Sequence, residues 1–423
     1  MHKKAFILIN LLLTIFLTGC FDSHEIGDFA YVTAMGVEQG ISDTFRITFQ
    51  IPKFGQSDGA DSEGGGGSGG KDSEQMEIIT IDASSMHSAV SIVNTNISKR
   101  LNFMHLKVIV ISEELSKSGL VGEFISPFVR YRQIRRTTGM VVCKGKAQDF
   151  IAAIKSYSGE PITYTIEELM KESRITGYFK KVSLNNFYSG IKTPYHALLG
   201  TYGAINKEDK LQNEGTIFRG ESDIPGDYYA GDVPRKGGSE IEFFGSAVFD
   251  GDKMVGKLTG FETQTILLVL GELKRVPFSI KDPEAPEWVI PIEVTEFEKT
   301  KISIDLKEGQ PKIHLRLKME GDIAAIQSGI NYEATEKRKK IEDAFEKFLV
   351  EGIERTFNKC KEFKTDVFNF GATAVLQFWT IPEWEEYNWL EKFLKSELNV
   401  EVDFTIRRTG KILKSEPIFG SVN

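Results

Sequence analysis

The sequence predicts a protein of mixed α+β and α/β class with two or three domains, and three observations support this prediction. The chain has 423 residues, whereas one domain usually takes about 100–200. Its first half alternates segments of strand and helix periodicity, as α/β units do. In its second half, alternating strands dominate around one long amphipathic helix. Because 41% of the residues are hydrophobic and 26% are charged, most of the chain can bury a core.

The first twenty residues predict an export signal with a lipid attachment site. Lysines 3 and 4 precede an apolar run, 5–17, that is shorter than the about 20 residues a membrane-spanning helix needs. The run fits the hydrophobic region of a secretory signal peptide. Thr18 and Gly19 are small, and Cys20 after them resembles the lipidated cysteine of the bacterial lipobox. We therefore expect removal of residues 1–19, with diacylglyceryl-Cys20 holding a soluble body at a membrane.

After this signal, an N-terminal domain is expected over residues 20–202. Strands are predicted at 29–37 and 44–51. Residues 55–73 are rich in Gly and Ser and predict a flexible loop. The next predicted elements are a helix at 84–100 with Ser84 or Ser85 as N-cap, a strand at 106–111, a helix from Ser112 interrupted at Pro127, a strand at 138–143 and a helix at 147–154.

A linker or long loop is predicted at 203–240, where Gly and Pro are frequent and apolar residues are few. A middle domain is then expected over 241–300 and a C-terminal domain over 301–423. The middle domain begins with a predicted hairpin, 243–249 and 253–258, and a helix at 261–273. The remaining predicted elements are strands at 288–296, 301–306, 313–319 and 400–406, a long helix at 332–361 and a shorter helix at 383–396.

Composition and motifs argue against several functions. Asp and Glu (60) outnumber Lys and Arg (52), which disfavours a nucleic-acid partner. The loop 65–71 matches part of the phosphate-loop pattern, but Asp72 stands where a Ser or Thr belongs, and no strand or helix flanks it. The histidines beyond the signal are scattered without metal-ligand spacing. We therefore predict no catalytic residues, no cofactor and no metal site, and a protein that is not an enzyme.

A few reactive residues have structural interpretations. His105 is interpreted as a hydrogen-bonded structural histidine. Cys143 ends an apolar strand and Cys360 lies on an apolar helical stripe, so both are interpreted as core thiols, and a disulfide between them stays an alternative in an exported protein. One charged cluster has two interpretations, either a solvated or internally paired face, or a surface for anionic lipid or an acidic partner. It consists of Arg130, Arg132, Arg135 and Arg136.

The order of several short motifs resembles the Ger(x)C-type spore germination lipoproteins, the C subunits of nutrient germinant receptors. These motifs are Gly19–Asp22, Ala34–Val37, Arg100–Ile109, Gly245–Phe249, Lys253–Leu258, Asp366–Gly371 and Arg407–Gly410. Phe21 departs from the family, which commonly has Trp there.

The resemblance implies three domains, each a β-sheet with packed helices. It also implies a complex with A-type and B-type receptor subunits at the outer face of the inner spore membrane, and a small-molecule germinant for the complex as a whole. The family has no catalytic residue to transfer, so Cys20 alone receives a chemical role.

Two other classes stay open. A solute-binding lipoprotein would capture a nutrient on its own, in a cleft between two lobes. A lipid-anchored hydrolase would need a nucleophile or carboxylate pair that the sequence does not show.

Overall fold

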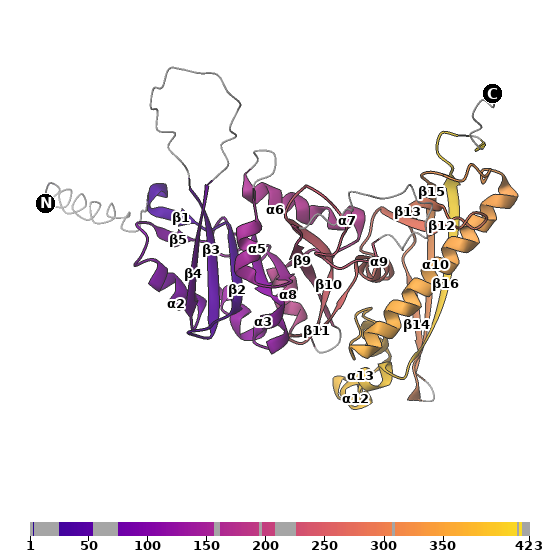
Figure 1. Cartoon of the computed structure of the whole chain (residues 1–423). Helices are drawn as coiled ribbons and strands as arrows, with labels where there is room; N and C mark the ends of the chain where they lie inside the picture. The colour runs from indigo at the N-terminus through magenta and orange to yellow at the C-terminus, as the bar shows by residue number, and fades with distance from the viewer. Residues whose placement is uncertain are drawn as a thin grey trace, which may run out of the picture.

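The protein has the mixed α+β architecture that its sequence predicts. The computed structural model describes residue 3 and residues 25–53, 75–155, 161–193, 197–207, 226–306, 309–412 and 414–416. The described strands form sheets of two, nine and five strands. Figure 1 shows the nine-stranded sheet toward the N-terminal end and the five-stranded sheet, crossed by a long helix, toward the C-terminal end.

The nine-stranded sheet has the order β11-β10-β9-β7-β6-β2-β3-β4, with β8 paired to β7. Its strands are β2 (Ala34–Gln39), β3 (Phe45–Lys53), β4 (Gln75–Ala83), β6 (Val108–Ser112), β7 (Gly139–Cys143), β8 (Val182–Ser183), β9 (Leu198–Ile205), β10 (Ile241–Asp250) and β11 (Lys253–Leu258). The strands β2, β6, β7 and β9 are parallel, so their carboxyl ends lie along one edge. A separate parallel pair joins β1 (Phe29–Tyr31) to β5 (Arg100–Asn102).

Helices cover both faces of the nine-stranded sheet because apolar side chains alternate between its faces. One face packs on α2 (Met86–Val93), α3 (Glu113–Ser118), α4 (Val121–Ile125) and α8 (Leu184–Gly190). The other packs on α5 (Ala147–Ala153) and α6 (Ile162–Lys171), which α7 (Ser173–Thr176) follows. The side chains of Ser85, Ser112 and Ser183 accept hydrogen bonds from the first turns of α2, α3 and α8. Ser85 is one of the two N-caps predicted for α2, and the sequence predicted that a helix starts at Ser112.

Two sequence-based boundaries differ from the structure. The strand predicted at 29–37 is divided, because Val32 and Thr33 donate their N–H groups to Asn102 and Gln50 and lead from β1 into a different sheet. The linker predicted at 203–240 joins adjacent strands, since β9 and β10 pair antiparallel from Ile205↔Ile241 onward. A Gly- and Pro-rich composition is typical both of a linker between domains and of a long loop between adjacent strands, so the sequence alone does not distinguish them. Residues 241–300 consequently contribute to two sheets, not to one middle domain.

The five-stranded sheet is built around one long strand. It contains β12 (Val276–Lys281), β13 (Val289–Phe297), β14 (Lys301–Asp305), β15 (Lys312–Ile323) and β16 (Glu397–Arg408). β13 and β14 pair antiparallel with successive parts of β15, and β16 pairs with it in parallel. The predictions in this region located β13 to β16 and missed β12.

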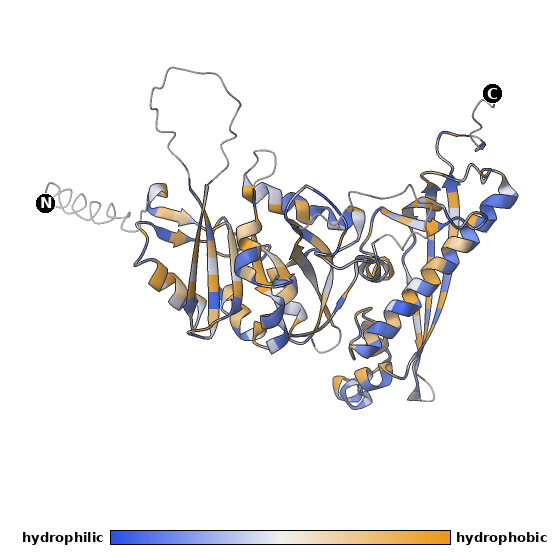
Figure 2. Ribbon diagram, viewed as in Figure 1, coloured by the Kyte–Doolittle hydropathy of each residue, from blue (hydrophilic) through white to orange (hydrophobic). Residues whose placement is uncertain are grey.

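The long helix α10 (Thr335–Glu362) covers this sheet with a stripe of buried side chains. Figure 2 shows hydrophobic and hydrophilic residues alternating along it. The short helices α11 (Gly371–Ala374), α12 (Ile381–Tyr387) and α13 (Trp389–Phe393) follow. The single helix predicted at 383–396 is two helices, because Asn388 between them has a left-handed backbone with φ of 52°. Among the described residues, no helix is both long and apolar enough to cross a membrane.

The helix α9 (Gly260–Val269) connects the two larger sheets, and all ten of its residues are buried. A capping box of Thr259 and Glu262 begins it. Its neighbours are the nine-stranded sheet on one side and α10 on the other, and one apolar cluster runs from β9 and β10 through α9 to the five-stranded sheet. Gly352 of α10 lets the helices approach, because a Cβ there would lie 2.8 Å from the Phe261 ring.

We expect Gly352→Val to lower the free energy of unfolding by about 2 kcal/mol, because the added side chain overpacks a buried contact. The measurement is urea denaturation of the purified chain. Glu351→Ala, at the neighbouring exposed position, is the control and should change stability by less than about 0.5 kcal/mol. A valine variant as stable as the wild type would contradict this packing.

The turn after α10 is organised by the buried carboxylate of Asp366. It accepts hydrogen bonds from the N–H groups of Phe370 (3.1 Å) and Gly371 (2.6 Å) and from the indole N–H of Trp389 (2.9 Å). Burial raises the pKa of Asp366 to about 6, although these hydrogen bonds oppose the rise. The folded chain therefore holds a proton there that the unfolded chain loses near pH 4.

We expect the stabilisation from Asp366 to be present below about pH 4 and to be lost as pH rises to about 6. Relative to Asp366→Asn, which cannot titrate, the wild type should lose about 2 kcal/mol of unfolding free energy between pH 4.5 and pH 7. Denaturation of both chains across that range measures the difference. If the stability of the wild type relative to Asp366→Asn stays constant or rises with pH, burial does not dominate the pKa of this carboxyl.

Candidate functional site

A charged cavity of about 770 Å³ lies at the edge where parallel strands of the nine-stranded sheet end. The carboxyl edge of parallel strands is a common position for ligand sites in α/β proteins. Its charges come from β2 and β3, from the helix α3 that follows β6, from the loop after β7 and from one side chain of β11. The charged lining residues are Glu38, Arg46, Glu113, Glu114, Lys117, Lys144, Lys146 and Lys257.

Glu113 is at the centre of the polar contacts in this cavity. Its carboxylate accepts a hydrogen bond from the hydroxyl of the fully buried Tyr202 and pairs with Lys117, each at 2.5 Å. Burial alone would raise the pKa of Glu113, but hydrogen bonds from Lys117 and Tyr202 outweigh it and hold this pKa below its usual value. Burial and the bond to Glu113 raise the pKa of Tyr202. At neutral pH the pair is thus a carboxylate and a neutral phenol, with no proton to exchange.

The ammonium group of Lys257 lies beside two aromatic rings. It is 5.5 Å from the ring centre of Tyr202 and 5.0 Å from that of Tyr229. Such contacts stabilise a cation weakly compared with a direct ion pair. Lys257 also lowers the pKa of Glu113 through its charge. It is therefore a positive group at the cavity wall that stays available to an anionic group of a ligand.

Other charges at the cavity are already engaged within the protein. Arg46 makes two hydrogen bonds to Asp82, at 2.7 and 3.0 Å, and these hold the pKa of Asp82 far below its usual value. Glu38 is buried and accepts the N–H of Gln148 at 3.1 Å. Such paired charges favour positioning over proton transfer.

The cavity residues suit binding of a small polar molecule better than covalent chemistry. None of the described residues that line it is a His or Cys, and the hydroxyl of Ser112 caps α3 by accepting the N–H of Leu115 at 3.2 Å. A nucleophile next to a base is the arrangement that covalent catalysis requires. Within the described part of the chain, no group of three or more His, Cys, Asp or Glu is placed to hold a metal ion.

The structure places several of the residues that the sequence singled out. Cys20 and the Gly-rich loop at 55–73 lie outside the described residues. Cys143 and Cys360 are free and buried, as expected of core thiols, so the alternative of a disulfide between them is wrong. His105 is exposed and contacts the edge of the Tyr31 ring, with 4.8 Å between ring centres, so its interpretation as a hydrogen-bonded structural histidine is also wrong.

The junction of α9 and α10 is a second polar site, and its role is to join the sheets. The Lys359 ammonium lies 2.6 Å from the carboxylate of Glu262, which is 5% exposed, and 2.9 Å from the hydroxyl of Tyr229. The hydroxyls of Thr265 and Thr356 are hydrogen-bonded at 3.1 Å. Because breaking one partner of a buried ion pair is costly, these contacts fix the relative position of the two helices.

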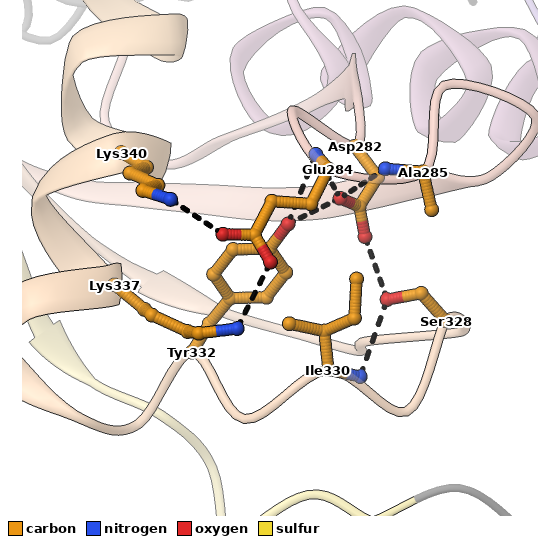
Figure 3. Close-up of polar contacts among 8 residues, drawn as sticks. All are labelled: Asp282, Glu284, Ala285, Ser328, Ile330, Tyr332, Lys337 and Lys340. Atoms are coloured by element: carbon orange, nitrogen blue, oxygen red, sulfur yellow. Dashed lines mark hydrogen bonds and ion pairs between the residues drawn. The ribbon is translucent and has the colours of Figure 1, made fainter.

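A third polar cluster lies where β12 ends and α10 begins, as Figure 3 shows. Buried Asp282 accepts hydrogen bonds from the hydroxyls of Tyr332 and Ser328 and from the N–H of Glu284 at 2.9 Å. Glu284 in turn pairs with two lysines of α10, Lys337 at 2.9 Å and Lys340 at 2.7 Å. All the contacts are internal, so this cluster fastens the helix to the sheet.

Sequence reasoning missed these three clusters because their members are far apart in the chain. Tyr202 and Glu113 are separated by 89 positions, and Lys359 and Glu262 by 97. One indication of these clusters was present in the sequence, which is that some of their residues lie at the ends of predicted strands or on the predicted long helix.

Comparison with known proteins identifies the family. Residues 22–202 match the model described as "Spore germination protein N-terminal domain", and residues 244–410 match "Spore germination B3/ GerAC like, C-terminal". The unmatched interval includes most of the connection between β9 and β10.

Relatives from Bacillus subtilis (strain 168) align over nearly their whole length. Spore germination protein KC is 24% identical, with 99% of this chain and 98% of the relative covered. Putative spore germination protein YfkR is 22% identical, with 96% and 97% covered. The crystal structure of the GerBC protein has a TM-score of 0.52 and 18% identity, with 88% of this chain and 96% of that chain covered, and it shares the fold. The chain belongs to the Ger(x)C-type family of spore germination proteins.

Proposed function

We propose that this chain is a lipid-anchored, non-enzymatic subunit of a nutrient germinant receptor complex that triggers spore germination. Its partners would be the A-type and B-type subunits, and its place the outer face of the inner spore membrane, held by diacylglyceryl-Cys20. The observation that carries the proposal is the match of both family domains, in order, together with spore germination relatives that align end to end. The lipobox sequence at Thr18–Cys20 supports the anchor.

The structure favours this proposal over a solute-binding lipoprotein that works alone. Solute capture by two lobes needs a cleft between them and a hinge that closes it. Here α9 fills the space between the sheets with buried side chains, and the Lys359–Glu262 pair crosses to α10. The charged cavity lies instead at the carboxyl edge of the nine-stranded sheet. A chain built in this way suits assembly with other subunits, and its cavity is a candidate place for a small polar ligand.

We expect Cys20→Ala to leave the chain unacylated and to shift it from the membrane to the soluble fraction, because the thiol that carries the diacylglyceryl group is absent. Spores that carry only this variant should release dipicolinate more slowly, or not at all, with one class of nutrient. The measurements are labelled-palmitate incorporation, fractionation and dipicolinate release. Cys143→Ala, at a buried thiol, is the matched control and should be acylated as the wild type is.

Normal acylation of Cys20→Ala would contradict the anchor. Saturable binding of a single nutrient by the isolated chain, combined with unchanged germination in its absence, would instead favour the solute-binding alternative.

A further inference from the structure

Six exposed basic side chains lie around β5 and in the segment that leads to β7. Four arginines lie between the last residue of η2 (Phe128–Arg130) and the start of β7, and two more basic residues are the last residue before β5 and the first residue of β5. All six are exposed. We call them the basic face: Lys99, Arg100, Arg130, Arg132, Arg135 and Arg136.

The two parts of the basic face are neighbours in the fold. The side-chain oxygen of Gln133, within the arginine segment, accepts the N–H of Phe103 at 3.1 Å, just after β5. The rings of Phe103 and Tyr131 have centres 5.7 Å apart and meet edge to face. These contacts hold the arginine segment against the end of β5.

This face also adjoins the point where the chain enters the body. β5 pairs in parallel with β1, with Phe29 opposite Arg100, as Figure 1 shows for the two strands. Cys20 precedes Glu25 by five positions, and five residues span at most about 18 Å. An acyl anchor on Cys20 is thus restricted to the neighbourhood of the basic face.

The charges of the basic face have no partners within the described protein. Among the described residues, none of these six side chains has an ion pair or hydrogen bond, whereas many other lysines and arginines of the structure are paired. Glu25 and Asp28 are the acidic residues at the start of β1, and they form the capping box of η1 (Ile26–Asp28). Glu167 lines a pocket together with Arg135, but its carboxylate is paired with Lys107 at 2.5 Å. The basic face is thus a local excess of positive charge in a chain whose net charge is −8.

Two exposed apolar side chains lie nearby, since Ile26 is in η1 just before β1, whose Phe29 is opposite Arg100, and Met104 lines a pocket together with Arg135. Ile26 is 81% exposed and Met104 is 54% exposed. Apolar side chains beside lysines and arginines are typical of surfaces that rest on a membrane, where the apolar groups enter the headgroup region and the cations meet lipid phosphates.

We propose that the basic face binds anionic lipid headgroups and orients the body on the membrane. This inference rests on the proposed function for the choice of membrane, since it takes Cys20 as the anchor. The two acyl chains of a diacylglyceryl group can hold Cys20 at the membrane but do not fix how the body faces it, whereas a basic patch attracted to anionic lipid can. Anionic lipid would relieve the repulsion among four arginines within seven residues. The position of the basic face beside the anchor favours lipid over an acidic protein as its partner.

The test is sedimentation of the mature chain, residues 20–423, with vesicles. Cys20→Ser removes any acyl chain, so that the surface alone is measured. The vesicles are phosphatidylcholine with 30% phosphatidylglycerol, or phosphatidylcholine alone. Each basic residue near an anionic surface strengthens binding about fivefold. Changing Arg130, Arg132, Arg135 and Arg136 to Gln should therefore weaken binding to the anionic vesicles by about 600-fold.

Three comparisons separate charge from structure. A chain with the same four arginines changed to Lys keeps the charge and should retain most of the binding to anionic vesicles. A control with Lys274, Lys301, Lys312 and Lys411 changed to Gln removes the same charge elsewhere and should bind within about twofold of the parent chain. The melting temperature of each chain is measured as a control for folding.

Binding that is equal for the parent and the Arg→Gln chain, or absent for the parent, would overturn the inference and leave an acidic protein as the partner of this face. The vesicle experiment uses the Cys20→Ser chain, so its result does not depend on acylation. Whether Cys20 is acylated is tested separately by labelled-palmitate incorporation.

Discussion

The burial of α9 is the constraint on which the rest of the structure depends. All ten residues of this helix are covered, so the nine-stranded sheet and α10 must both be in place for its apolar surface to leave water. Glu262 serves two purposes, because it completes the capping box of α9 and pairs with Lys359 of α10. The two large sheets are therefore coupled through one helix, and a force applied to either sheet is transmitted to the other.

This coupling gives the charged features of the surface a fixed relation to one another. The cavity around Glu113 lies at the carboxyl edge of the parallel strands β2, β6 and β7, whereas the arginine segment ends where β7 begins, at the amino edge. A body oriented by its basic face would thus point the cavity away from the membrane at that part of the sheet. In a receptor complex, such an orientation suits a subunit that meets membrane-embedded partners on one side and small solutes on the other.

Local chemistry explains what could be predicted from the sequence. Ser85 and Ser112 as caps, the hairpin around Gly251 and the stripe of α10 depend on residues a few positions apart. The pairing of β9 with β10, the Tyr202–Glu113 contact and the α9–α10 junction depend on residues tens of positions apart, and no periodicity encodes them. The exposure of His105 was missed because its apolar neighbours Phe103 and Leu106 are buried while His105 and Met104 face outward. The arginine cluster was noticed in the sequence, but its closeness to β1 required the fold.

The most direct test of a receptor subunit is germination of spores that lack this chain. Dipicolinate release is followed against a panel of single nutrients, with the wild-type gene restored as the control. We expect loss of the response to one nutrient class, with normal dipicolinate stores before germination and recovery in the restored strain. An unchanged response to every nutrient, in spores that also lack any other nutrient germinant receptors, would contradict a receptor subunit.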